Sequence, residues 1–186
     1  MSWARKYRSL KDKLSLEADR KEVSSDVLFN QFQEKLKELY QEFNGMIDGT
    51  MIQTKYHKHL ISKEQRSALF GEKERVDALI LSDNDNELKI IPEGIHFIGV
   101  LGRVVVRAYR KVYTFNSIIE RRLKLFKEPH FFLVHDQEKD NEVTWGYIEG
   151  EESSLFGKEV KKLTPSIIEK LLDEVFLSSN EQNDSK

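Results

Sequence analysis

The chain has 186 residues, 39% of them hydrophobic and 33% charged, and a formal net charge of −2 at pH 7. This length and mixture predict a globular domain with its own core, and the near-neutral balance excludes recruitment of nucleic acid or an anionic membrane by overall charge. The chain has no cysteine, which excludes disulfides, thiol nucleophiles and Cys-ligated metal and fits a reducing compartment. No apolar run is long enough to span a membrane and no secretory signal is recognisable, so we expect a cytoplasmic protein.

Two helices are predicted at the start of the chain. Residues 1–23 are expected to form a basic amphipathic extension, because Trp3, Tyr7, Leu10, Leu14 and Ala18 recur every three or four positions. Such a helix packs on its neighbour or rests on an acidic partner or membrane surface. A longer helix follows the N-cap cluster at residues 24–26, with an apolar stripe formed by Leu28, Phe32, Leu36, Leu39, Tyr40, Phe43 and Ile47. That stripe is typical of a core face or a coiled-coil seam.

The middle of the chain changes to strand character. Residues 50–61 fit either a helix or a strand, and a capping box at Ser62 predicts a short helix over residues 63–70. Alternating apolar runs then predict six strands, over residues 76–82, 87–91, 95–101, 103–115, 131–135 and 143–148. The sequence SDNDN predicts a turn, Pro92–Gly94 predicts a break, and Gly102 predicts a turn or bulge.

Two further helices are predicted after the long strand. Ser117 and Glu120 form a second capping box, which predicts a short helix through Lys127. Thr164 and Pro165 predict the start of a closing helix. The expected fold is therefore α+β, with a mainly antiparallel sheet of about six strands flanked by a long N-terminal helix and a C-terminal helix. Residues 24–178 would form one domain and residues 179–186 a disordered tail.

The strand over residues 103–115 carries the candidate binding surface. Its even positions Val104, Val106, Ala108 and Val112 form an apolar face interrupted by Arg110, whereas its odd positions alternate cations with aromatic residues. Residues 103–127 hold eight cations and one acid, and residues 136–152 hold seven acids and one lysine. Cations beside flat aromatic rings suit single-stranded nucleic acid, and pairing with the acidic segment is the simpler alternative. The candidate ligand-binding residues are Arg103, Arg107, Tyr109, Lys111, Tyr113, Arg121 and Arg122.

Motifs for metal or catalytic chemistry are weak. His57 and His59 would share a face only on a strand, and the loop over residues 83–94 lacks the glycine and glutamate of a calcium-binding loop. Asp77 with Glu87 and Lys89 loosely fits the acid and Glu-x-Lys spacing of metal-dependent nucleases. Serine-nucleophile and phosphate-loop motifs are missing from the sequence. We therefore assign no catalytic residue, no metal ligand and no cofactor.

The sequence favours a non-catalytic interaction or regulatory protein. Its N-terminal helices would bind a protein partner or self-associate, because both predicted helix faces are rich in large apolar residues. Single-stranded nucleic-acid binding through the basic strand is the second hypothesis, and a metal-dependent nuclease is the third.

Overall fold

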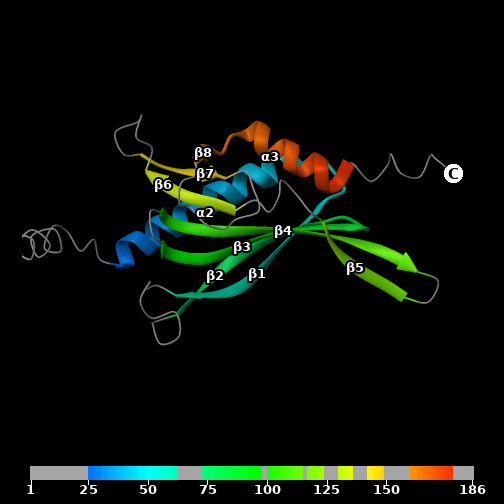
Figure 1. Cartoon of the computed structure of the whole chain (residues 1–186), viewed down its shortest axis with the longest axis horizontal. Coiled ribbons are helices and arrows are strands. Elements are labelled where there is room, and N and C mark those ends of the chain that lie inside the picture. Colours follow the sequence, from blue (N-terminus) through cyan, green and yellow to red (C-terminus); the bar gives the residue numbers. More distant parts are fainter. Residues whose placement is uncertain are drawn as a thin grey trace, which may run out of the picture.

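The computed structural model describes residues 25–62, 73–97, 100–114, 117–123, 130–135, 142–148 and 160–177. The predicted extension over residues 1–23, the helix over residues 63–70 and the tail over residues 179–186 lie outside these ranges. Two helices lie on one side of a twisted sheet, and a hairpin extends beyond them (Figure 1). The predicted α+β class with a mainly antiparallel sheet is confirmed.

Helix α2 (Ser25–Ile47) packs its apolar stripe on the protein's own sheet. Phe32, Leu36 and Phe43 are buried with sheet residues in a single core cluster. The indole N–H of Trp145 donates to the backbone carbonyl of Lys35 at 2.9 Å, which ties the helix to a distant strand. The stripe is therefore part of the core and is not free for self-association.

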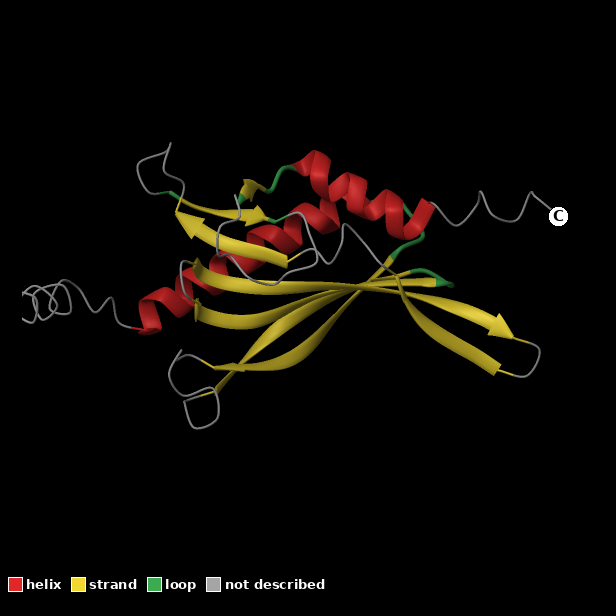
Figure 2. Cartoon of the chain, in the orientation of Figure 1, coloured by secondary structure: helices red, strands yellow, loops and turns green. Residues whose placement is uncertain are grey.

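The described residues form eight strands in one sheet. They are β1 (Gln53–Ser62), β2 (Lys73–Ser82), β3 (Asn86–Phe97), β4 (Val100–Thr114), β5 (Ser117–Leu123), β6 (His130–His135), β7 (Val143–Tyr147) and β8 (Lys161–Lys162). The strand order is β1-β2-β3-β4-β6-β7-β8, and β5 pairs with the far half of β4. Neighbours in this order are antiparallel, while Ser62 of β1 makes one parallel pairing with Gly94 of β3. Figure 2 shows the strands fanning out with the twist of an open sheet.

Several sequence predictions are corrected by this arrangement. Residues 117–123 form strand β5 and not a helix, because pairing with β4 satisfies their backbone groups and overrides the local capping pattern. Pro92–Gly94 is a bulge inside β3 and not a break, with Gly94 at a φ of 144° that favours glycine. The segment that fitted both helix and strand is strand β1 over Gln53–Ser62.

Gly102 lies within β4 and forms neither a turn nor a bulge. A Cβ atom at this position would collide with the ring of Phe32 on α2. The glycine therefore permits the close approach of helix and sheet. The predicted turn was wrong because the same residue serves packing between elements.

The closing helix is confirmed. Helix α3 (Pro165–Leu172) begins after Thr164 and continues into the π-helical turn η2 (Asp173–Leu177). Its buried residues join the core that α2 covers: Ile168, Leu171, Leu172, Val175 and Phe176. Both helices therefore cover the face of the sheet that carries Leu79, Ile90 and Val106. The opposite side of the sheet is here called the outer face.

Candidate nucleic-acid interface

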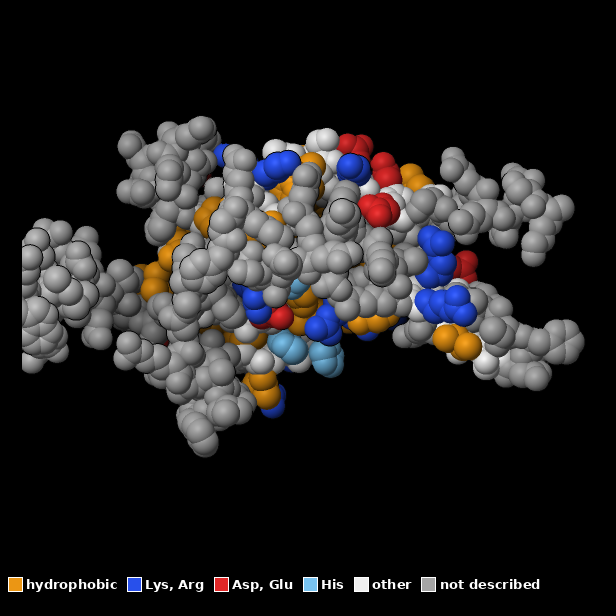
Figure 3. Space-filling view, viewed as in Figure 1, with side chains coloured by type: hydrophobic (Ala, Val, Ile, Leu, Met, Phe, Trp, Pro, Cys, Tyr) orange, Lys and Arg blue, Asp and Glu red, His pale blue; other side chains and the backbone are white. Residues whose placement is uncertain are grey.

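A row of cations crosses the outer face of the sheet. In the register, Lys55 of β1 lies opposite Ile80 of β2, Ile80 lies opposite Lys89 of β3, and Lys89 lies opposite Arg107 of β4. Directly opposed residues project on the same side of a sheet. We define the basic face as Lys55, Lys89, Arg107, Tyr109 and Lys111. On the lower part of the view in Figure 3, His side chains lie near Lys or Arg, Asp or Glu and hydrophobic side chains.

Three cations of the basic face are available to a ligand. Lys55, Arg107 and Lys111 are exposed, and none of them forms an ion pair with a carboxylate among the described side chains. The ammonium of Lys111 donates to the backbone carbonyl of Asn84 at 3.1 Å, which orients the side chain without neutralising it. Acidic residues also lie near these cations: Glu120 is opposite Lys111 in the register, and Glu87 is opposite Tyr109.

Tyr109 supplies a flat ring within the basic face. Its side chain is half-buried, and the Lys89 ammonium lies 5.1 Å from the ring centroid. Lys89 also pairs with Glu87 at 2.7 Å, so that this lysine is shared between a carboxylate and the ring. A nucleic-acid base can stack on the face of the Tyr109 ring away from Lys89, or on the face that the Lys89 ammonium covers if that ammonium moves aside.

A concave region of about 720 Å³ lies at one end of the basic face. It is lined by Lys55, Tyr109 and Lys111 and by the turn between β2 and β3, which contributes the acids Asp83, Asp85 and Glu87. That turn is built on Asp83, whose carboxylate accepts from the backbone N–H of Asp85 at 2.8 Å and of Asn86 at 2.6 Å. These bonds confirm the predicted hairpin turn, since the Asp83 side chain caps the backbone of the loop.

The predicted ridge is only partly open. Arg103 is half-buried and forms an ion pair with Glu93, and Val105 is buried. Arg107 and Lys111 are exposed and Tyr109 is half-buried, so the open part of the ridge begins at Arg107. Strand β6 pairs with β4 over Gly102–Val105 and runs away from Lys111. His135, the last residue of β6, therefore lies toward the end of β4 away from Lys111.

The two arginines of β5 do not both join this face. Arg121 is paired with Arg110. Arg110 is at an even position of β4, like Val106 and Ala108, whose side chains face the helices. Arg121 therefore lies on the other side of the sheet from Arg107. Arg122 is opposite Tyr109 in the register, while its side chain and that of Tyr113 lie outside the described atoms.

Two residues of the basic face were missed by sequence reasoning. Lys55 precedes Arg107 by 52 residues in the sequence, and Lys89 precedes it by 18. Strand pairing alone brings the three residues into one row. The alternation Lys55, His57, His59 was a usable signal, because on a strand these residues share one side. On a helix the same three residues would not share one side, and the sequence of this segment fits both structures.

The residues considered for metal chemistry are separated. Asp77 has the helix-facing parity of Leu79 and pairs with Lys58 at 2.8 Å, whereas Glu87 and Lys89 lie on the outer face. The nuclease spacing is therefore not assembled into one site. His57 and His59 do share the outer face, and within the described ranges no group of three or more His, Asp and Glu residues is placed to hold a metal ion.

Comparison of the chain with protein-family models, with curated proteins and with solved structures finds no significant match. In the described part of the chain, neither helix has the length and apolar character needed to cross a bilayer.

Proposed function

We propose that the protein is a non-catalytic binding protein whose basic face binds single-stranded nucleic acid. The observation that carries the proposal is the aligned row of Lys55, Lys89 and Arg107, with Tyr109 and Lys111 beside it on the same side. Cations neutralise phosphates and thereby release counterions, while an aromatic ring gives every base a stacking surface. In the reducing compartment that a cysteine-free chain fits, such a protein would act on nucleic acid without modifying it.

The surface favours single strands over duplexes because of its shape. The basic face belongs to a sheet whose strands lie side by side, with Arg107 and Lys111 on β4 and Lys55 on β1. A sheet of this kind offers a broad platform on which splayed bases can lie flat. A duplex keeps its bases stacked and would leave Tyr109 without a role.

The test measures binding of a fluorescent single-stranded oligonucleotide by anisotropy over a series of salt concentrations. Arg107→Ala combined with Lys111→Ala should weaken binding and lower the slope of log affinity against log salt by about 1.4, since each lost phosphate contact contributes about 0.7 for single strands. Lys161→Ala combined with Lys162→Ala removes two exposed cations on β8 and should change neither quantity.

Tyr109 distinguishes nucleic acid from other polyanions. Tyr109→Ala should cost about 1–3 kcal/mol of binding with the salt slope unchanged, and Tyr109→Phe should preserve binding because the ring remains. An oligonucleotide that fails to bind at low ionic strength would overturn the proposal. Equal binding of heparin by wild type and Tyr109→Ala, with no Tyr109 effect on the oligonucleotide, would reduce the surface to a general anion site.

A further inference from the structure

The edge of the sheet formed by β1 is unusually open. Strand β1 is ten residues long and stands at the end of the strand order, paired with β2 along one side. Within the described ranges, its other side is paired only where Ser62 meets Gly94. Nearly all of its side chains from Gln53 to Leu60 are exposed, including Tyr56 at 54% and Leu60 at 57%. A long edge with free backbone N–H and C=O groups can accept another strand.

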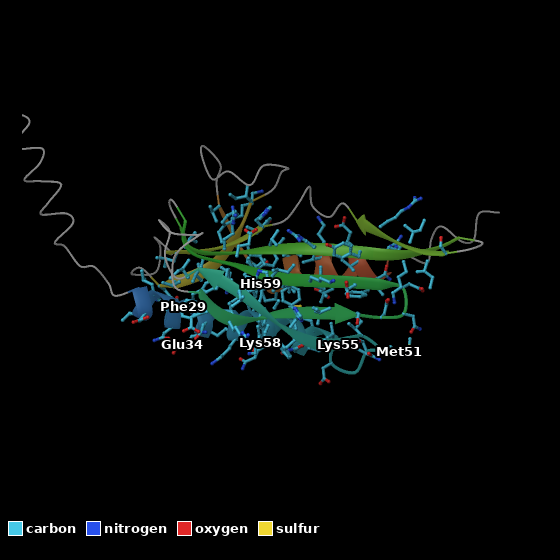
Figure 4. The ribbon with its side chains drawn as sticks, turned by 90° about the horizontal axis from the view of Figure 1, so that it is seen from below. Phe29, Glu34, Met51, Lys55, Lys58 and His59 are labelled. Carbon is cyan, nitrogen blue, oxygen red and sulfur yellow. The ribbon has the colours of Figure 1, made fainter. Side chains whose placement is uncertain are left out.

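A groove runs beside this edge on the helix-facing side. Gln33, Lys37 and Gln41 of α2 form one wall at helical spacing, and Tyr56 and Lys58 of β1 form the other. The cavity has a volume of about 390 Å³, and Leu36, Tyr40 and Val76 line it with apolar surface. This space suits one large apolar side chain. Figure 4 shows Lys55, Lys58 and His59 along β1, with α2 carrying Phe29 and Glu34 beside the strand.

Side-chain contacts close one end of the groove. Asn44 of α2 donates to the hydroxyl of Tyr56 at 2.9 Å and accepts from the hydroxyl of Thr54 at 3.0 Å. The rings of Tyr40 and Tyr56 lie 6.1 Å apart at an interplanar angle of 53°. These contacts fix the position of β1 relative to α2, so the groove is preformed and a ligand would not have to order it.

The charge of the edge and groove selects the kind of ligand. Lys37, Lys58 and Arg75 line the groove with one acid, Asp77, which pairs with Lys58 at 2.8 Å. Two β1 strands carrying two lysines each and no acid would repel one another, which disfavours pairing with a second copy. An acidic strand is favoured for the same reason.

We propose that β1 and the adjoining groove bind an extended acidic segment of another protein by strand addition. The segment hydrogen-bonds to the edge of β1, places alternate side chains toward α2, and inserts one apolar side chain beside Leu36 and Tyr40. Its carboxylates lie near Lys37, Lys58 and Arg75. This inference does not depend on nucleic-acid binding, because the groove opens on the opposite side of the sheet from the basic face.

The experiment uses the full chain and a panel of labelled nine-residue peptides that alternate Glu with Val, with one Phe moved along the positions. Binding is measured by anisotropy, and the site is mapped by hydrogen exchange. At least one acidic peptide should bind and slow exchange of the β1 amides. The same peptides with Lys in place of Glu should not bind. Acidic peptides that all fail to bind, or that bind without protecting β1, would overturn the proposal.

Two variants and two modified peptides test the mechanism. Lys58→Glu combined with Arg75→Glu should lower the affinity for the acidic peptide at least about tenfold, because two favourable charges become repulsive. Lys161→Glu combined with Lys162→Glu makes the same charge change on β8, at the other end of the strand order, and should have little effect. Two further peptides carry N-methyl groups, one on the odd-numbered residues and the other on the even-numbered residues. Only one of these sets donates its N–H groups to β1, so only that peptide should lose binding. Equal binding of both sets would mean charge attraction without strand pairing and would contradict the proposal.

Discussion

Tyr40 couples the core to the proposed peptide groove. Its hydroxyl donates to the backbone carbonyl of Asp77 at 2.7 Å, joining α2 to β2. Burial raises the pKa of Tyr40 well above its ordinary value near 10, and the nearby Asp77 carboxylate raises it further. The neutral hydroxyl is therefore the form that the fold requires.

This pKa makes stability fall at alkaline pH. The group releases its proton more easily in the unfolded chain, so its contribution is complete below about pH 10 and is lost as the pH rises above that value. Tyr40→Phe should cost about 1 kcal/mol at pH 7 through the lost hydrogen bond. The deficit should shrink or reverse in urea titrations between about pH 10 and pH 11. A deficit that stays constant over this range would contradict the pKa assignment.

Gly102 tests the contact between α2 and the sheet. Gly102→Ala places a methyl group against the Phe32 ring, and overpacking of this kind costs about 1–3 kcal/mol. Phe32→Leu should lower the cost of Gly102→Ala when the two are combined, because the smaller side chain leaves room. The measurement is a double-mutant cycle in urea. Simple additivity of the two changes would show that Phe32 is not the obstacle.

At the scale of the element, the β4–β5 hairpin carries an unfavourable pairing. Arg110 and Arg121 are directly opposed, and like charges in that relation destabilise an antiparallel pair. Arg110 is anchored by its Nε, which donates to the Asn86 side chain at 3.1 Å. Ile118 and Ile119 are also exposed, at 63% and 43%. In the same register Lys111 is opposite Glu120, so the hairpin combines one like-charged and one oppositely charged pair.

Reversing one of these charges should stabilise the hairpin. Arg121→Glu should raise the free energy of unfolding by about 0.2–1 kcal/mol through a new pair with Arg110, and Arg121→Gln should give a smaller gain by removing repulsion alone. Thermal denaturation at low and high salt measures both effects, and salt should reduce them. A loss of stability in Arg121→Glu would imply that Arg121 has a favourable interaction in the wild type.

At the scale of the whole molecule, both helices and the sheet share one core. Phe43 of α2, Leu88 of β3, Trp145 of β7 and Val175 of η2 belong to the same buried cluster. No part of this core can be exposed without uncovering the rest, so we expect a single cooperative transition.

That cooperativity can be measured with Trp145 as a local probe. In a Trp3→Phe variant, Trp145 is the only tryptophan, and its fluorescence reports on the core at Lys35. The urea midpoints from fluorescence and from far-ultraviolet circular dichroism should coincide. Two separate midpoints would show that α2 and the sheet unfold as independent units.

Local periodicity was sufficient for the parts of the fold that bury one regular face. The α2 stripe from Phe32 to Ile47 and the even positions of β4 from Val104 to Ala108 are buried, and the closing helix forms after Thr164 as predicted. Apolar residues recur in these segments at the helix or strand period because the residues on one face all pack into the same core. The fold class and the odd positions from Arg107 to Lys111 as a partly exposed set therefore followed from the sequence.

Tertiary structure alone decided which residues meet. The segment after Ser117 forms a strand despite its capping pattern, because it pairs with β4. Gly102 leaves room for the Phe32 ring. Lys55 is aligned with Arg107 across the two strands that lie between them. Arg121 was separated from Arg107 by the alternation of sides along a paired strand. The repeat of apolar residues along the sequence indicates which side of its own helix or strand a residue occupies. The register between distant strands depends on packing across the whole sheet.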